Sequence, residues 1–200
     1  MGTGLSRSSI PSAEAESQIL ERARNGDRKA VREIYDRYSG YLAATCARFF
    51  PDQRDQKDVL QESFVKIFTS LDSFDYRGEG SLKAWMRRIL VNESLKVLRR
   101  RRRSVPIVFE DVVRDIPDEE DVEPPDMAKV PAEAIQEMIK GLPEGYRTVF
   151  NLYALEEKSH KEIAGLLGIS EGTSASQLYR ARLMLAKMIK EYKEKVKIKR

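Results

Sequence analysis

Apolar residues recur at helical spacing along most of the chain, and no segment alternates in the way that a half-buried strand requires. Residues 14–103 contain few glycine or proline breaks, and their apolar positions predict a first pair of helices on either side of the turn Asn25-Gly26-Asp27. Further helices are predicted over 58–71 and from about Ser81 into a run of arginines. The pattern therefore predicts an all-α N-terminal part.

The helical pattern stops near residue 104 and resumes at Pro131, a residue that suits the first position of a helix. Between Phe109 and Asp126 the chain has nine acidic residues and one arginine, together with three prolines. Such a composition is typical of an extended, flexible linker. We therefore predict an all-α chain with two small helical domains, residues 14–103 and 131–200, a flexible acidic linker over 104–130 and a disordered lead-in over 1–13.

Composition excludes several classes of protein. No stretch approaches the roughly 20 consecutive apolar residues that span a bilayer, and the N-terminus lacks the apolar segment of a secretory signal, so we expect a cytoplasmic protein without membrane insertion. The chain has one cysteine and one histidine, Cys46 and His160. An intramolecular disulfide, a cysteine zinc cage and a hydrolase triad therefore lack their residues, and we predict a non-enzymatic protein without metal or cofactor. Cys46 itself is predicted to be a small buried residue in a helix.

Charge is distributed unevenly around a formal net charge of +4. Residues 99–103 are five consecutive arginines, and residues 171–200 hold nine basic and three acidic residues. With the acidic linker between them, this layout suits a protein that touches polyanions at two separate places. Composition alone leaves open a second interpretation, in which two solvated helix surfaces flank a spacer.

The C-terminal part has the local signals of a helix-turn-helix. Ser159 and Glu162 have the spacing of a capping box, Gly168 is expected to end the helix that they begin, and Ser170 is placed to cap the next one, which runs to about Lys190. A short helix, a turn containing glycine and a longer helix are the parts of this DNA-binding motif. The sequence therefore predicts that this region binds duplex DNA, with His160 as a polar residue of the first turn.

The second helix of this motif has two distinct sides at 100° per residue. Its apolar side is predicted to pack inward and consists of Leu178, Ala181, Leu185, Met188 and Ile189. The opposite side carries hydroxyl and basic residues, Thr173, Ser176, Arg180 and Lys187, with Tyr179 at its edge. Small hydroxyls followed by basic residues suit insertion into a major groove. The simpler interpretation is an amphipathic helix with a solvated basic side.

The predicted helix from Ser81 carries a second polar and basic stripe. Arg88, Asn92 and Arg99 fall within about 40° of one another, away from the apolar side on which Trp85 is predicted to pack. Arginine favours phosphate, and asparagine offers a donor and an acceptor to a base edge. In the loop upstream, the side chains that suit stacking on an unstacked base are Phe74, Tyr76 and Arg77. Glu93 falls on the apolar side of this helix without an evident reason.

Several stretches resemble the extracytoplasmic-function (ECF) group of the sigma-70 family of bacterial sigma factors. They are GDRKAVREIYDRY (26–38), DVLQESFVKIF (58–68), DSF followed by RGEGSLKAWMRRILVN (77–92), LPEGYRTVFNLYALE (142–156), and SHKEIAGLLGISEGT with LYRAR (159–182). The resemblance covers most of the chain outside its ends and linker. It implies a sigma-2 helical bundle and a sigma-4 domain with the helix-turn-helix, joined by the linker.

The resemblance also implies partners and roles. Core RNA polymerase would be bound at the clamp helices of its largest subunit and at its flap, the former through Asp58, Gln61, Glu62 and Val65. The minus 10 element of promoter DNA would be bound by Phe74, Tyr76, Arg77, Arg88, Asn92 and Arg99, with a flipped base in the loop. The minus 35 element would be read by Thr173, Ser176, Gln177, Tyr179, Arg180 and Lys187. The resemblance further implies an anti-sigma factor as a regulator.

Two departures from the family pattern bear on specificity. Asp75 and Tyr76 are additional residues before the Arg-Gly of the loop, and Ser174-Ala175-Ser176-Gln177 stands where the usual pattern is Val-Lys/Arg-Ser-Arg. Because two basic positions are lost, weaker or altered minus 35 recognition is expected. The alternatives are a stand-alone helix-turn-helix transcriptional regulator, which leaves the N-terminal motifs unexplained, and a helical adaptor that binds no DNA, which leaves the two basic faces unexplained.

Overall fold

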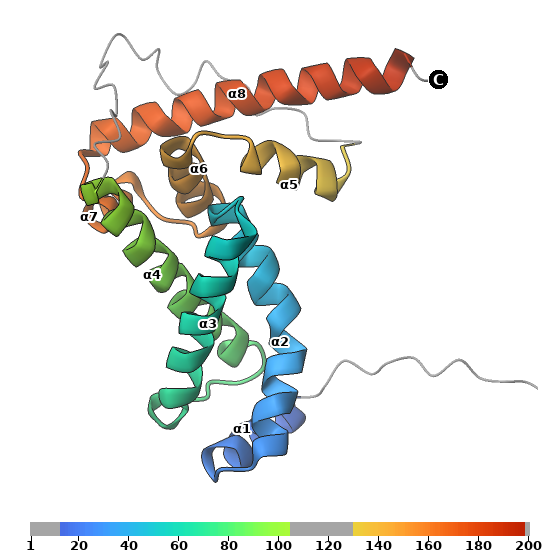
Figure 1. The fold of residues 1–200 in the computed structure, drawn as a ribbon, viewed down its shortest axis with the longest axis vertical. Coiled ribbons are helices and arrows are strands. Elements are labelled where there is room, and N and C mark those ends of the chain that lie inside the picture. The colour runs from blue at the N-terminus through green and yellow to red at the C-terminus, as the bar shows by residue number, and fades with distance from the viewer. Residues whose placement is uncertain (1–12, 105–129, 199–200) are drawn as a thin grey trace, which may run out of the picture.

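The computed structural model describes residues 13–104 and 130–198, and this part of the chain is helical without a strand (Figure 1). Its elements are α1 (Ala13–Arg24), α2 (Arg28–Phe49), α3 (Gln53–Thr69), the 3-10 turn η1 (Leu71–Ser73), α4 (Ser81–Ser104), α5 (Ala132–Lys140), α6 (Glu144–Phe150), the π-helical turn η3 (Asn151–Leu155), α7 (His160–Leu167) and α8 (Glu171–Ile198). The all-α prediction is confirmed. Most of the predicted linker and lead-in lies outside the described residues.

Helix starts are set by short polar side chains. Asp27 caps α2 by accepting hydrogen bonds from the backbone N–H groups of Lys29 and Ala30, after the turn in which Gly26 has a φ of 82°. Asp52 caps α3 in the same way, so this helix begins at Gln53, five residues before the predicted start at 58. α8 is also longer than predicted, since it continues beyond Lys190 to Ile198.

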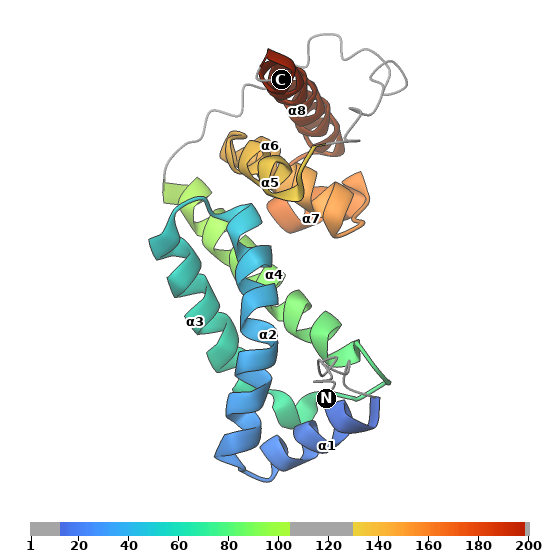
Figure 2. The same ribbon diagram turned by 90° about the vertical axis from the view of Figure 1, so that its right-hand side faces the viewer.

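The helices form two bundles. In the N-terminal bundle (α1–α4), α2, α3 and α4 run along the long axis of the molecule and contact one another, while α1 crosses one end (Figures 1 and 2). In the C-terminal bundle (α5–α8), α8 lies across the other end, with α5 and α6 packed beneath it. α7 lies beside α4. None of the described helices has the length and apolar character needed to cross a membrane.

One apolar core extends through both bundles. Leu20, Leu42, Met86 and Leu90 are buried in the N-terminal bundle, and the same cluster continues into the C-terminal bundle through residues that include Leu152. Cys46 is buried in this core as predicted, and burial raises the pKa of its thiol to about 12. The thiol is therefore protonated at neutral pH and acts as an apolar core group.

Two side chains of the C-terminal bundle cap the end of α2. The Arg147 guanidinium, only 5% exposed, donates from Nε to the Phe49 carbonyl at 3.1 Å, and Asn151 Nδ2 donates to the Arg48 carbonyl at 2.7 Å. The last carbonyls of a helix have no hydrogen-bond partner within the helix. Arg147 and Asn151 supply donors to two of them, and a buried carbonyl without a donor would cost free energy. An ion pair of 2.8 Å between Arg87 of α4 and Glu156 adds a third contact between the bundles.

Candidate nucleic-acid interface

The helix-turn-helix forms as its local signals predict. Ser159 Oγ accepts from the Glu162 N–H at 3.2 Å and the Glu162 carboxylate accepts from the Ser159 N–H at 2.9 Å, which completes the capping box of α7. A hydrogen bond from Lys158 and those from Ser159 lower the pKa of Glu162 to about 2. Gly168 ends α7 with a φ of 63°, and Ser170 Oγ accepts from the Thr173 N–H at the start of α8.

His160 has a more definite position than that of a polar first-turn residue. Its Nδ1 lies 2.9 Å from the hydroxyl of Ser174, which is fully buried, and its ring stacks on Tyr153 with centroids 4.9 Å apart. The contact joins the first helix of the motif to the second. It also gives the buried Ser174 hydroxyl a hydrogen-bond partner, which accounts for a hydroxyl on the inward side of α8.

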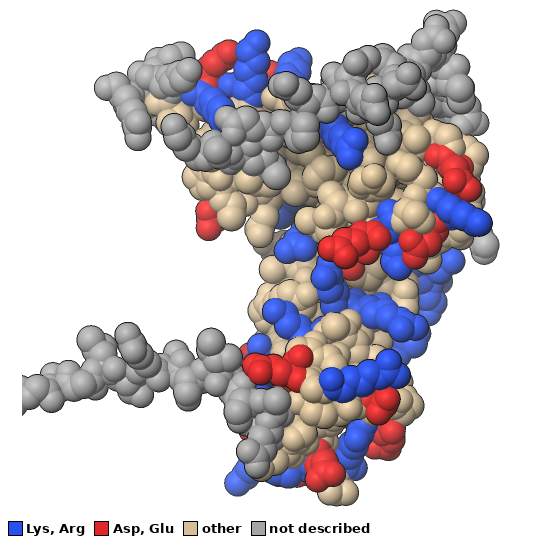
Figure 3. Space-filling model, turned by 180° about the vertical axis from the view of Figure 1, so that it is seen from behind, with Lys and Arg blue, Asp and Glu red and all other residues tan. Residues whose placement is uncertain are grey.

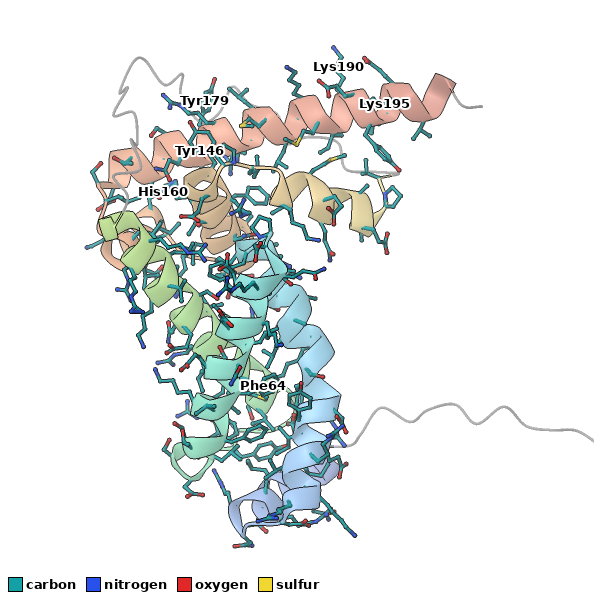
Figure 4. The ribbon with its side chains drawn as sticks, in the orientation of Figure 1. Phe64, Tyr146, His160, Tyr179, Lys190 and Lys195 are labelled. Carbon is teal, nitrogen blue, oxygen red and sulfur yellow. The ribbon has the colours of Figure 1, made fainter. Side chains whose placement is uncertain are left out.

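The predicted minus 35 residues of α8 differ in their exposure, and Thr173, Ser176 and Arg180 are half-buried. Tyr179 lies on the side that faces away from α5 and α6, as does Lys190 further along (Figure 4), and Lys187 is exposed. Gln177 is only 4% exposed and its Oε1 has no hydrogen-bond partner among the described residues, so its side chain is not presented to a ligand in this structure, and its DNA contact stays a prediction. Leu183 on the same helix is 44% exposed.

Three of the predicted minus 35 side chains already make hydrogen bonds within the protein. Arg180 Nη1 donates to the hydroxyl of Tyr146 at 3.2 Å, and Tyr146 lies between α6 and α8 (Figure 4). The hydroxyls of Thr173 and Ser170 are 2.8 Å apart, and Ser176 Oγ donates to the Thr173 carbonyl at 3.0 Å. A base contact by any of them replaces or shares an existing bond.

The stripe on α4 divides between two hollows. Arg88 and Asn92 are exposed and line a groove of about 860 Å³ between α4 and the C-terminal bundle, whose other wall includes Glu156 and Leu166. Arg99 instead lines a hollow of about 770 Å³ on the α3 side. Basic side chains gather over the middle of the face opposite to the one seen in Figure 1 (Figure 3). The structure therefore brings Arg88 and Asn92 together and separates Arg99 from them.

Glu93, unexplained by the sequence, bridges α3 and α4. Its carboxylate accepts from Lys66 Nζ at 2.5 Å and lies 3.5 Å from Lys96 Nζ. Burial opposes ionisation, but the hydrogen bond and charge of Lys66, with the charge of Lys96, lower the pKa of Glu93 overall. Its position on the apolar side of α4 is thus that of a paired carboxylate between two helices.

The loop between η1 and α4 presents fewer side chains than predicted. Phe74 is only 7% exposed and packs on Trp85 with ring centroids 4.8 Å apart, so its ring is not presented to a base in this arrangement, and its stacking on a base stays a prediction. Trp85 packs against the core as expected. Arg77 is exposed and pairs with Asp75 at 3.1 Å, and Tyr76 is half-buried. The loop therefore presents Arg77 and the edge of Tyr76.

The predicted polymerase face of α3 lies on the surface. Asp58, Gln61, Glu62 and Val65 are all exposed. Val65 is 55% exposed, and it is one of few large apolar side chains at the described surface. An acidic surface with one exposed apolar residue is chemically suited to a protein partner.

Comparison with known proteins gives the family. The Sigma-70 region 2 family matches residues 34–104, and the Sigma-70, region 4 family matches residues 132–185. The chain is 33% identical over 179 residues to the ECF RNA polymerase sigma-E factor of Haemophilus influenzae, an alignment that covers 86% of this chain and 93% of that protein. It is 32% identical to the Escherichia coli protein of the same name, an alignment that covers 82% of this chain and 88% of that protein. It is 30% identical to the RNA polymerase sigma-H factor of Pseudomonas aeruginosa, an alignment that covers 88% of this chain and 94% of that protein.

These matches include both the bundle with the α4 stripe and the bundle with the helix-turn-helix. The chain belongs to the sigma-70 family of RNA polymerase sigma factors, in its ECF group. The family consists of non-enzymatic transcription initiation factors. The stand-alone regulator is not favoured, because it requires only the region 4 match.

Proposed function

We propose that this protein binds core RNA polymerase in the cytoplasm, directs it to specific promoters and helps to melt the minus 10 region. The observation that carries the proposal is the pair Arg88 and Asn92, exposed side by side on α4 within the region 2 match. A guanidinium for phosphate beside an amide for a base edge suits a single DNA strand.

Melting in this proposal needs no hydrolysis. Extruding a base costs a few kcal/mol, and binding of the opened strand together with polymerase contacts offsets that cost. Because Arg88 and Asn92 line the groove against the C-terminal bundle, we expect the bundles to move apart when a strand enters. The C-terminal bundle then reads the minus 35 element as duplex through the outward side of α8. An anti-sigma regulator stays a prediction from the family resemblance.

Core polymerase in this proposal docks on the exposed face of α3. Val65→Asp is expected to weaken core binding by about 30-fold, since loss of a central apolar contact in an interface typically costs about 2 kcal/mol. The matched control is Val196→Asp, the same change at an exposed valine of α8, which should leave core affinity within about twofold. Equal affinities for the two variants would exclude α3 as the docking helix.

The proposed function is tested by run-off transcription with cognate core polymerase and genomic promoter fragments. The expected result is promoter-specific transcripts with the wild-type protein and their loss with Val65→Asp. If the folded protein binds core but yields no promoter-specific transcript, the proposal is wrong, and the helical adaptor becomes the better interpretation.

A further inference from the structure

α1 has polar contacts that its place in the core does not explain. It lies outside both family matches, which begin at residues 34 and 132. Its apolar side chains Ile19, Leu20 and Ala23 are buried in the core, as expected of a helix that packs on α2. Glu16 and Arg24 instead reach the segment that leads from η1 into the loop before α4.

Arg24 binds two backbone carbonyls on this segment. Its Nε donates to the Leu71 carbonyl at 3.0 Å, and its Nη2 donates to the Phe74 carbonyl. These carbonyls lie at the two ends of the η1 turn, where the loop begins. Since a guanidinium is planar and its donors are fixed relative to one another, one Arg24 side chain holds both carbonyls in a single geometry.

Glu16 links α1 to α2 and acts electrostatically on the same loop. Glu16 is only 6% exposed, and its carboxylate accepts a hydrogen bond from the Tyr38 hydroxyl at 2.5 Å. Burial and the Glu16 carboxylate also raise the pKa of Tyr76, the residue at the centre of the loop. The carboxylate therefore bonds α1 to α2, and its charge acts on the side chain next to Arg77.

The other end of the loop is fixed independently of α1. Ser81 Oγ donates to the Gly78 carbonyl at 2.6 Å and accepts from the Arg77 N–H at 3.2 Å. Gly78 and Gly80 have φ values of 103° and 81°, which L side chains rarely adopt. The start of the loop is thus the part whose position depends on Arg24.

We propose that α1 positions the loop of residues 72–80 for capture of the minus 10 strand, without touching DNA itself. Arg24 fixes the first turn of the loop, which leads into Tyr76, while Ser81 holds the backbone of Arg77 at the other end. The proposal rests on the proposed function for its consequence in promoter opening. The anchoring itself can be measured without DNA.

Arg24→Ala tests the anchoring directly, with Arg22→Ala as its matched control. Arg22 lies on the same helix and pairs with Asp27 at 2.7 Å, so its replacement removes one charge from α1 without a loss at the loop. Trp85, the only tryptophan of the chain, packs on Phe74 and reports on the start of the loop by its fluorescence. Arg24→Ala should increase acrylamide quenching of Trp85, and Arg22→Ala should not. Equal quenching in the two folded variants would overturn the anchoring.

The consequence for opening is tested by permanganate reactivity of thymines in complexes with core polymerase. Arg24→Ala should reduce opening about tenfold at saturating core, because it removes two charge-assisted hydrogen bonds, while core affinity stays within about twofold. Arg24→Lys should restore part of the opening, since a lysine reaches one carbonyl. The proposal would be contradicted if Arg24→Ala opened the promoter as well as Arg22→Ala does, or if its core affinity fell as much as its promoter opening. α1 would then have only a packing role. If even the wild-type protein fails to open a promoter while the quenching difference is present, the proposed function fails and the anchoring stands.

Discussion

The two bundles use their polar side chains differently. In the N-terminal bundle, Arg88 and Asn92 are exposed along a groove. In the C-terminal bundle, Gln177 is buried, Arg180 bonds to Tyr146, and the guanidinium of Arg147 is enclosed against α2. Among the predicted DNA contacts, Arg88 and Asn92 are therefore open to a ligand, whereas Gln177 is buried and Arg180 is already bonded within the protein.

This difference suggests a division of labour between the two promoter readers. Arg88 and Asn92 are exposed and have no hydrogen bond to another described residue, so a strand meets these two side chains without displacing a partner once the bundles have moved apart. Contacts from Thr173, Ser176 and Arg180 instead replace or share existing hydrogen bonds, and two basic positions of the family pattern are lost on α8. We therefore expect the N-terminal bundle to dominate promoter choice and the C-terminal bundle to add affinity.

The largest expected effect is on stability, at Arg147. Its guanidinium donates to three carbonyls, those of Phe49, Lys140 and Leu142. Arg147→Ala leaves these buried carbonyls without a donor and should lower the free energy of unfolding by about 3 kcal/mol. Urea denaturation measures the change, with the exposed Arg54→Ala as the control that should stay within about 0.5 kcal/mol. A similar small loss at Arg147 would mean that its buried bonds contribute little.

The next largest effect is expected for the exposed pair. Replacing both Arg88 and Asn92 by alanine should reduce promoter opening by up to about 100-fold, since a charged and a neutral hydrogen bond together are worth about 2 to 3 kcal/mol. Permanganate reactivity with saturating core measures opening, and a core pull-down measures the binding that should be unchanged. Losing core binding and opening to the same extent would contradict a direct role of this pair at the strand.

Gln177 and Ser176, adjacent on α8, separate burial from DNA contact. Gln177→Ala should change the free energy of unfolding by about 1 kcal/mol, through lost packing, while leaving the minus 35 sequence preference intact. Ser176→Ala should leave stability nearly unchanged and weaken minus 35 binding by about threefold, as expected of one neutral hydrogen bond. Thermal unfolding and duplex binding measure the two effects. If Gln177→Ala instead weakened minus 35 binding and Ser176→Ala did not, the result would show that α8 rotates on binding DNA.

The smallest effect concerns pH and the capping box of α7. Because the pKa of Glu162 is lowered to about 2 from an ordinary value of 4.5, the stabilisation by its ionised form is complete above pH 4.5 and is lost as the pH falls toward 2. Glu162→Gln keeps the capping geometry without the charge. Its melting temperature should be about 1 to 2 °C below wild type at pH 7, and the two should converge near pH 2. A difference that persists at pH 2 would assign the effect to geometry.

Periodicity and capping signals predicted the parts of the molecule that depend on local sequence. The inward side of α8 was correct, with Leu178, Ala181, Leu185 and Ile189 buried, and so was the capping box. Contacts between distant segments had no such signal. Arg147 occurs in a helix start like many exposed arginines, and nothing in the sequence marks its contact with Phe49, which lies 98 residues away. The burial of Phe74 had no signal either, because an aromatic residue in a loop has the same sequence pattern whether its ring faces solvent or packs on Trp85.

The division of labour between the bundles is tested most directly by altering the promoter instead of the protein. Run-off transcription with core polymerase is compared on one responsive promoter with its minus 10 element scrambled, with its minus 35 element scrambled, and intact. The account predicts that scrambling the minus 10 element abolishes the transcript, whereas scrambling the minus 35 element reduces it only several-fold. A greater loss from the minus 35 change would contradict it and make the helix-turn-helix the dominant reader.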